Sequence, residues 1–181
     1  MSARAAERPA VRFAVLGMVL GSALVGCQPE FNVPVAPPPL DRAYFRCHVQ
    51  SVLTRSCSMF ACHGADGTSG TNSRYFRVYA RSRLRAAGIA EAMRNSTFTA
   101  AEYEANFTAA GDLVDVGAPD NSLLLLKPLD QSAGGFFHRG ADLYGQGDVF
   151  LSKTDPDFVL LSAWVHGATE DPKCIEPGSD Q

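Results

Sequence analysis

The chemically most informative group in the sequence consists of Cys57, Cys62 and His63, with four residues between the two cysteines. Two thiols and an adjacent imidazole on one short loop can hold a haem, because the thiols add to its vinyl groups and the imidazole coordinates its iron. Three other uses remain open. The cysteines can form a disulfide with His63 and Gly64 in a surface turn, or hold a structural zinc ion with a fourth ligand such as His138, or supply a nucleophile with His63 as its base.

The spacing of this motif differs from the usual one in c-type cytochromes, where two residues separate the cysteines. Here residues 58–61 (Ser-Met-Phe-Ala) separate them. The motif resembles the Cys-x4-Cys-His attachment sites of some multihaem cytochromes, in which the extra residues bulge outward. The resemblance implies that Cys57 and Cys62 form thioether bonds to haem c and that His63 is the proximal iron ligand.

A second axial iron ligand has to come from elsewhere in the chain. We expect His138, because it lies between the mid-chain loop and the last helix and is flanked by Gly135 and Gly140, which permit close approach of a porphyrin. The alternative for His138 is a solvated loop position. His166 is expected to be structural, because a cation is favoured at a helix C-terminus. The remaining candidates are His48, Met59 and Met93, of which Met93 is the runner-up.

The N-terminal residues have the features of an export signal. Residues 1–26 combine arginines with a short apolar run that ends in small residues, which is typical of a secretory signal peptide. The run Leu24-Val25-Gly26-Cys27 resembles a bacterial lipobox, and this implies lipidation of Cys27 and stable anchoring by its acyl chains. The proline-rich stretch 27–40 is expected to be an extended tether. We therefore expect a protein of the bacterial cell envelope that is held by a lipid anchor in the outer membrane and faces the periplasm. The alternative is a secreted protein without a lipid anchor.

Export places the other cysteines in an oxidising compartment, where pairs are expected. Cys47 and Cys174 lie near the two ends of the folded region, so we expect a structural disulfide between them. The composition, with 46% hydrophobic residues, excludes a disordered chain. A formal net charge of −3 argues against nucleic acid as a partner. One domain, residues 41–181, is expected.

Local signals predict a mostly α-helical domain with long loops. Asp41 is expected to cap a helix over 42–56 that leads into the motif, and Thr99 with Glu102 forms a capping box for a helix that ends near Gly111. A short helix over 121–126 should follow. Asp155, followed by proline, begins a last helix over 156–166. Its buried face is expected to contain Phe158, Leu161, Trp164 and Val165, whereas residues 75–79 read as a strand or a turn.

The order of these parts resembles that of the planctomycete-type and myxobacterial cytochrome c-like lipoproteins. The segments that carry the resemblance are the motif, residues 122–129, residues 134–140 and residues 161–168. It implies a compact cytochrome c-like fold in which the first and last helices cross around a haem slot. It also implies a monohaem electron carrier or redox sensor rather than an enzyme, with a redox partner protein. The alternatives are a disulfide-stapled or zinc-stabilised envelope lipoprotein with a structural or binding role and no haem.

Arginines cluster in an otherwise acidic chain. A solvated basic face is the expected arrangement, and the alternatives are binding of haem propionates by one or two guanidinium groups or of an acidic partner or phosphate headgroup. The cluster consists of Arg74, Arg77, Arg81, Arg83, Arg85 and Arg94.

Overall fold

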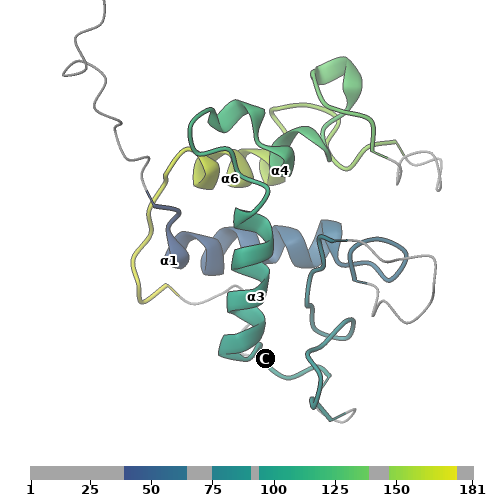
Figure 1. Ribbon diagram of the computed structural model, residues 1–181, viewed down its shortest axis with the longest axis vertical. Coiled ribbons are helices and arrows are strands. Elements are labelled where there is room, and N and C mark those ends of the chain that lie inside the picture. Colours follow the sequence, from purple (N-terminus) through teal and green to yellow (C-terminus); the bar gives the residue numbers. More distant parts are fainter. Residues whose placement is uncertain (1–38, 65–74, 91–93, 139–146, 175–181) are drawn as a thin grey trace, which may run out of the picture. The chain divides into compact units, whose positions relative to one another are not determined.

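The computed structural model describes residues 39–64, 75–90, 94–138 and 147–174, which belong to the unit Pro37–Gln181 (Figure 1). The expected signal peptide 1–26, Cys27 and the tether up to residue 38 lie outside the described residues. The described part is mostly helical and contains no strand, only an isolated parallel bridge between Leu129 and Phe150. The elements are α1 Arg42–Tyr44, η2 Phe45–Val49, α2 Gln50–Val52, η3 Leu53–Cys57, α3 Ala100–Gly111, η5 Pro119–Asn121, α4 Leu123–Leu126, η6 Gln131–Ala133 and α6 Pro156–Val165.

The first four elements follow one another without a break and form one helical segment, Arg42 to Cys57. As predicted, Asp41 caps it: the Tyr44 amide donates to Asp41 Oδ1 at 2.6 Å. Two turns are π-helical, because their closing hydrogen bonds reach back five residues, to Phe45 and to Leu53. Such wide turns are frequent at functional sites. The second one delivers Cys57 at the end of the segment.

α6 runs antiparallel to this first helical segment. The Arg55 guanidinium, near the end of the segment, lies 2.6 Å from Asp157 at the start of α6. At the other end, Trp164 Nε1 donates to the Asp41 carbonyl at 2.9 Å. The predicted N-cap is present, since the Asp157 amide donates to Asp155 Oδ1. The predicted buried face is also confirmed: Phe158, Leu161, Trp164 and Val165 are all buried.

α3 lies across the first helical segment (Figure 1). The predicted capping box of Thr99 and Glu102 begins it. Phe107 of α3 meets Phe45 of η2 and Trp164 of α6, with ring centroids 5.3 and 5.7 Å apart, and Phe45 and Trp164 are 5.2 Å apart. Aromatic pairs at these distances attract one another beyond their hydrophobic burial. This triangle of rings joins the three longest helical parts at the core.

The structure contains the expected disulfide between Cys47 and Cys174, whose Cα atoms are 6.1 Å apart across a separation of 127 residues. The Arg46 side chain donates to the carbonyls of Pro172 and Cys174, so polar contacts support the bridge. Closing a loop of this length lowers the entropy of the unfolded chain by an amount worth about 5 kcal/mol in the loop-entropy model. The bridge holds the residues after α6 on η2.

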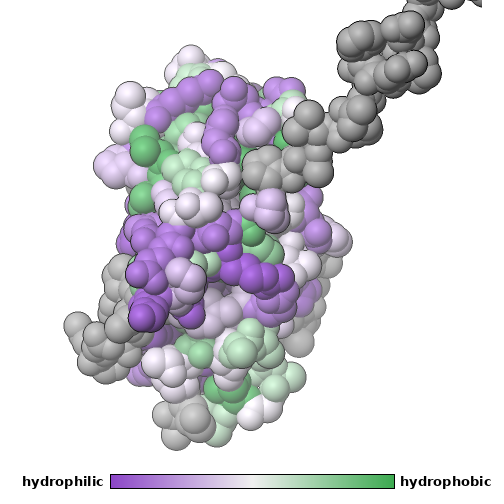
Figure 2. Space-filling model, turned by 90° about the vertical axis from the view of Figure 1, so that its left-hand side faces the viewer, coloured by the Kyte–Doolittle hydropathy of each residue, from purple (hydrophilic) through white to green (hydrophobic). Residues whose placement is uncertain are grey.

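Hydrophilic side chains cover much of the face drawn in Figure 2, where hydrophobic areas are small and separate. Two ion pairs join elements of the fold: Arg42 of α1 pairs with Glu104 of α3, and His48 Nε2 of η2 lies 2.8 Å from Glu170. Among the described residues, every helix is too short or too polar to cross a bilayer.

Candidate functional site

The motif loop begins where the first helical segment ends. The Cys62 and Gly64 amides both donate to the Met59 carbonyl, at 2.8 and 3.0 Å, and the His63 amide donates to the Cys57 carbonyl at 3.0 Å. These bonds fold the chain back, so that Cys62 and His63 return beside Cys57. Both cysteines are half-buried thiols.

The residues between the cysteines divide into an inner and an outer part. Met59 and Phe60 are 53% and 58% exposed, whereas Ser58 is fully buried. Met59 and Phe60 therefore form the outward bulge of the longer spacing, and Ser58 anchors it inside. The next glycine is required by close approach: a Cβ on Gly64 would lie 1.9 Å from the Ser58 carbonyl oxygen.

Burial controls the chemistry of the first thiol. It raises the pKa of Cys57 to about 12, and negative charge on Cys62 and Asp157 adds to the effect. Cys57 is therefore a neutral thiol at neutral pH, and this argues against Cys57 itself as a nucleophile, since the thiolate is the reactive form. The disulfide hypothesis for Cys57 and Cys62 is not what the structure contains.

The orientation of His63 is set by its neighbour Phe76 in the 75–80 segment, which is neither helix nor strand. His63 Nδ1 lies 2.8 Å from the Phe76 carbonyl oxygen. Since a carbonyl only accepts, Nδ1 carries the proton and Nε2 carries the lone pair that a metal ligand needs. The Val78 amide donates to the His63 carbonyl at 2.9 Å, and the Phe76 ring contacts the imidazole edge-on. Side chain and backbone of His63 are both held.

His138 lies opposite His63. The two ring centroids are 6.2 Å apart and the ring planes differ by 14°. With metal–nitrogen bonds of about 2 Å, two imidazoles on opposite sides of one metal have ring centres roughly 6 Å apart. The centroid distance of this stacked pair thus matches that spacing.

The turn before His138 requires a glycine at position 135. A Cβ on Gly135 would lie 1.7 Å from the Leu129 carbonyl oxygen, so Gly135 permits a close backbone approach within this turn. The Phe136 amide donates to the Leu126 carbonyl, and Lys127 Nζ donates to the Phe137 carbonyl. These bonds fix the chain next to His138. Gly140 lies outside the described residues.

Of the other candidates for the second axial ligand, Met59 lies in the motif loop and lines the same cavity as His63 and His138, whereas His48 and His166 lie elsewhere. His48 pairs with Glu170 near the disulfide, and His166 hydrogen-bonds the Ser162 carbonyl at the end of α6, as its structural role predicts. Met93 lies outside the described residues. Cys47 also precedes a histidine, but its sulfur is bonded to Cys174.

A cavity of about 870 Å³ joins the motif to His138. Its size falls within the range of small-molecule and cofactor sites. Most of the wall is apolar, and Cys57, Cys62, His63 and His138 all line it. Apolar lining residues include Phe76, Leu113, Leu124, Phe137, Val149 and Leu161, and charged ones include Arg55, Lys127 and Asp148.

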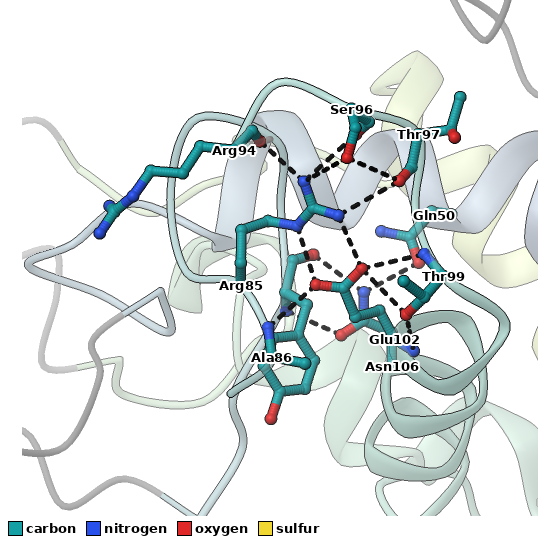
Figure 3. A network of polar contacts seen from close by, with 10 residues as sticks. Gln50, Arg85, Ala86, Arg94, Ser96, Thr97, Thr99, Glu102 and Asn106 are labelled. Atoms are coloured by element: carbon teal, nitrogen blue, oxygen red, sulfur yellow. Dashed lines mark hydrogen bonds and ion pairs between the residues drawn. The ribbon is translucent and has the colours of Figure 1, made fainter. Parts of the chain in front are cut away.

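Two arginines of the cluster, Arg83 and Arg85, are hydrogen-bonded within the fold rather than solvated as expected, and none of the described members of the cluster lines the cavity. Arg85 forms a bidentate ion pair with Glu102, with both oxygens at 2.8 Å, and the two side chains are 4% and 0% exposed (Figure 3). Burial by itself would raise the pKa of Glu102, but hydrogen bonds from Arg85 and from the amides of Ala86 and Thr99 lower it to about 2. Sequence reasoning placed Glu102 only in the capping box and missed this pair. Arg74 lies outside the described residues.

The zinc and haem alternatives need different sets of protein ligands. Within the described ranges, no group of three or more His, Cys, Asp or Glu side chains is arranged to hold a metal ion. A zinc site would need four ligands at once, whereas a haem iron needs only two axial ones from the protein.

Comparison of the chain with protein families, with curated proteins and with solved structures finds no match.

Proposed function

We propose that the protein is a monohaem c-type cytochrome-like electron carrier. Cys57 and Cys62 hold the haem through thioether bonds, His63 is the proximal iron ligand and His138 the distal one. The observation that carries the proposal is the parallel pair of imidazoles, 6.2 Å apart, on the wall of an apolar cavity that also contains both thiols. When bound, the haem supplies a one-electron iron couple.

The residues of this chain would tune that couple in two ways. The Phe76 carbonyl accepts from His63 Nδ1, which orients the ring and makes Nε2 a stronger electron donor. Apolar side chains such as Leu124 and Leu161 keep water away from the centre of the cavity. Two histidine ligands favour a lower potential than a histidine and a methionine.

The proposed site in the cell follows from the N-terminus. Cleavage after residue 26, lipidation of Cys27 and the tether over 27–40 would hold the domain at the bacterial envelope, in the outer membrane facing the periplasm. A redox partner protein would exchange single electrons with it there.

The test uses the full chain, exported in a host with active cytochrome c maturation. Intact mass under denaturing conditions should show a gain of one haem, with Soret absorption, and the variant Cys57→Ala/Cys62→Ala should lose both. His138→Ala should keep the covalent haem but change the visible spectrum and the midpoint potential. The matched control is His48→Ala, because His48 is a histidine on the same domain that pairs with Glu170 and does not line the cavity.

A colourless protein with no gain in mass would contradict the proposal. If Cys57 and Cys62 were then found paired, the chain would be a doubly stapled envelope lipoprotein. The Cys47–Cys174 bridge already supports that second candidate.

A further inference from the structure

One arginine of the cluster contacts the motif loop directly. Arg83 Nη1 donates to the Thr54 carbonyl at 2.7 Å and to Ser58 Oγ at 2.6 Å. Ser58 Oγ in turn donates to the same Thr54 carbonyl at 2.6 Å. The three groups form a closed triangle on the last turn of the first helical segment, immediately beside Cys57.

The triangle supplies hydrogen-bond donors to a carbonyl at the end of this helical segment. The closing π-type bond runs from the Ser58 amide to the Leu53 carbonyl, which leaves the Thr54 carbonyl to side-chain donors. A guanidinium is a favourable partner there, because carbonyl oxygens at a helix C-terminus carry partial negative charge. Ser58 is the one fully buried member of the four residues between the cysteines. Arg83 thus holds the inner residue of the bulge.

The position of Arg83 is fixed by the residues on either side of it in the sequence. Its neighbour Arg85 is fixed by the buried ion pair with Glu102, and Arg85 Nη1 also donates to the Arg94 carbonyl at 2.8 Å (Figure 3). Ser82 adopts a left-handed φ of 58°, an uncommon conformation for a residue with a side chain, at the turn that precedes Arg83. The turn is closed by the Arg83 amide, which donates to the Ala80 carbonyl.

The residues from 75 to 86 therefore hold the motif at both ends. Phe76 and Val78 bond to His63 at its far end, and Arg83 bonds to Ser58 at its near end. We propose that Arg83 is a positioning residue for the haem-attachment loop: by clamping Ser58 to Thr54 it sets the place of Cys57 relative to Cys62 and His63 despite the four-residue spacing. This inference rests on the proposed function, but its main test does not need the haem.

That test measures alkylation of the two thiols. The full chain is produced without haem attachment and exposed to iodoacetamide under native conditions, and fragment masses report Cys57 and Cys62 separately. In the wild type, Cys57 should react slowly, because burial raises the pKa of its thiol. Arg83→Ala should raise the Cys57 rate about tenfold or more, the size expected for loss of hydrogen bonds from a charged group. In Arg83→Lys the Cys57 rate should lie between those of the wild type and Arg83→Ala, because an ammonium group retains a charged donor for the same acceptors.

Two further variants separate positioning from general stability. Ser58→Ala removes one acceptor of the clamp and should also raise the Cys57 rate. Arg42→Ala removes an arginine that pairs with the exposed Glu104 away from the loop, and should leave the rate unchanged. The inference is overturned if Arg83→Ala leaves the Cys57 rate at the wild-type value. It is equally overturned if the rate rises only in proportion to a loss in the free energy of unfolding, measured with urea on the same protein.

The haem-loaded protein provides the second readout. Arg83→Ala should lower the fraction of chains that carry covalent haem and shift the midpoint potential of the rest, whereas Arg42→Ala should do neither. A wild type without haem would contradict the proposed function and leave the alkylation result to decide the role of Arg83.

Discussion

Glu102→Gln is the sharpest test of the buried ion pair that anchors the residues beside the motif. Glutamine keeps the size of the side chain but removes its charge, so the Arg85 guanidinium, only 4% exposed, loses its counterion. Breaking a buried ion pair by removing one partner typically costs about 3–5 kcal/mol. At pH 7 we therefore expect the free energy of unfolding to fall by about that amount.

The pH dependence of this effect follows from the pKa of Glu102. Although burial opposes it, the hydrogen bonds to the carboxylate lower that pKa from 4.5 to about 2 in the fold. A carboxylate with a lowered pKa stabilises the fold above its unfolded pKa and loses that contribution as the pH falls through its folded pKa. The contribution is about 3 kcal/mol above pH 5 and about 1 kcal/mol at pH 3. The difference in free energy of unfolding between the wild type and Glu102→Gln should thus be about 2 kcal/mol smaller at pH 3 than at pH 7.

The assay is urea unfolding at pH 7 and at pH 3. Fluorescence of Trp164, the single tryptophan of the chain, reports on the core because the residue is fully buried. The matched control is Glu104→Gln, a carboxylate on the same helix whose pair with Arg42 is exposed and worth no more than about 1 kcal/mol. The reasoning is refuted if the wild type and Glu102→Gln differ equally at the two pH values, or if the two glutamine variants are equally stable at pH 7.

Three further changes test other parts of the structure by the same unfolding measurement. Gly64→Ala should cost about 1–3 kcal/mol, because its Cβ would collide with the Ser58 carbonyl oxygen at 1.9 Å; wild-type stability would mean that the loop adapts. Replacing both Cys47 and Cys174 by serine should cost about 5 kcal/mol, and a loss below about 1 kcal/mol would argue against the bridge in solution. Leu161→Ala should cost about 2–5 kcal/mol, since Leu161 is buried at the cavity wall; an unchanged value would contradict its packing there.

The parts of the fold that could be predicted are those decided by neighbours in sequence. Asp41, Thr99 and Asp155 each bond an amide two or three residues ahead, so the sequence alone was enough to place the starts of three helical parts. The buried face of α6 followed from its period for the same reason. The π-helical turns were not predicted, because they are rare local departures from the α-helical hydrogen-bond pattern that the apolar spacing indicates.

Contacts between distant residues were predicted less evenly. His63 and His138 were expected to share a site from their order along the chain, and the structure brings their rings together. The path of residues 75–86 could not be predicted, since it depends on a buried ion pair between Arg85 and Glu102. No local sequence pattern indicates that these two residues pair. The arginine cluster was therefore assigned to solvent when two of its members are structural.

The disulfide also changes what a protease can do to this protein. The bond between Cys47 and Cys174 turns the intervening chain into a covalent ring, and Cys57, Cys62, His63 and His138 all lie within that ring. A single cut anywhere between the two cysteines opens the ring but releases no fragment, so both new ends stay attached to the same molecule. A nicked protein would migrate as one band on a denaturing gel and separate into two only after reduction. After a single cut, all four residues of the candidate site would therefore still belong to one covalently linked molecule.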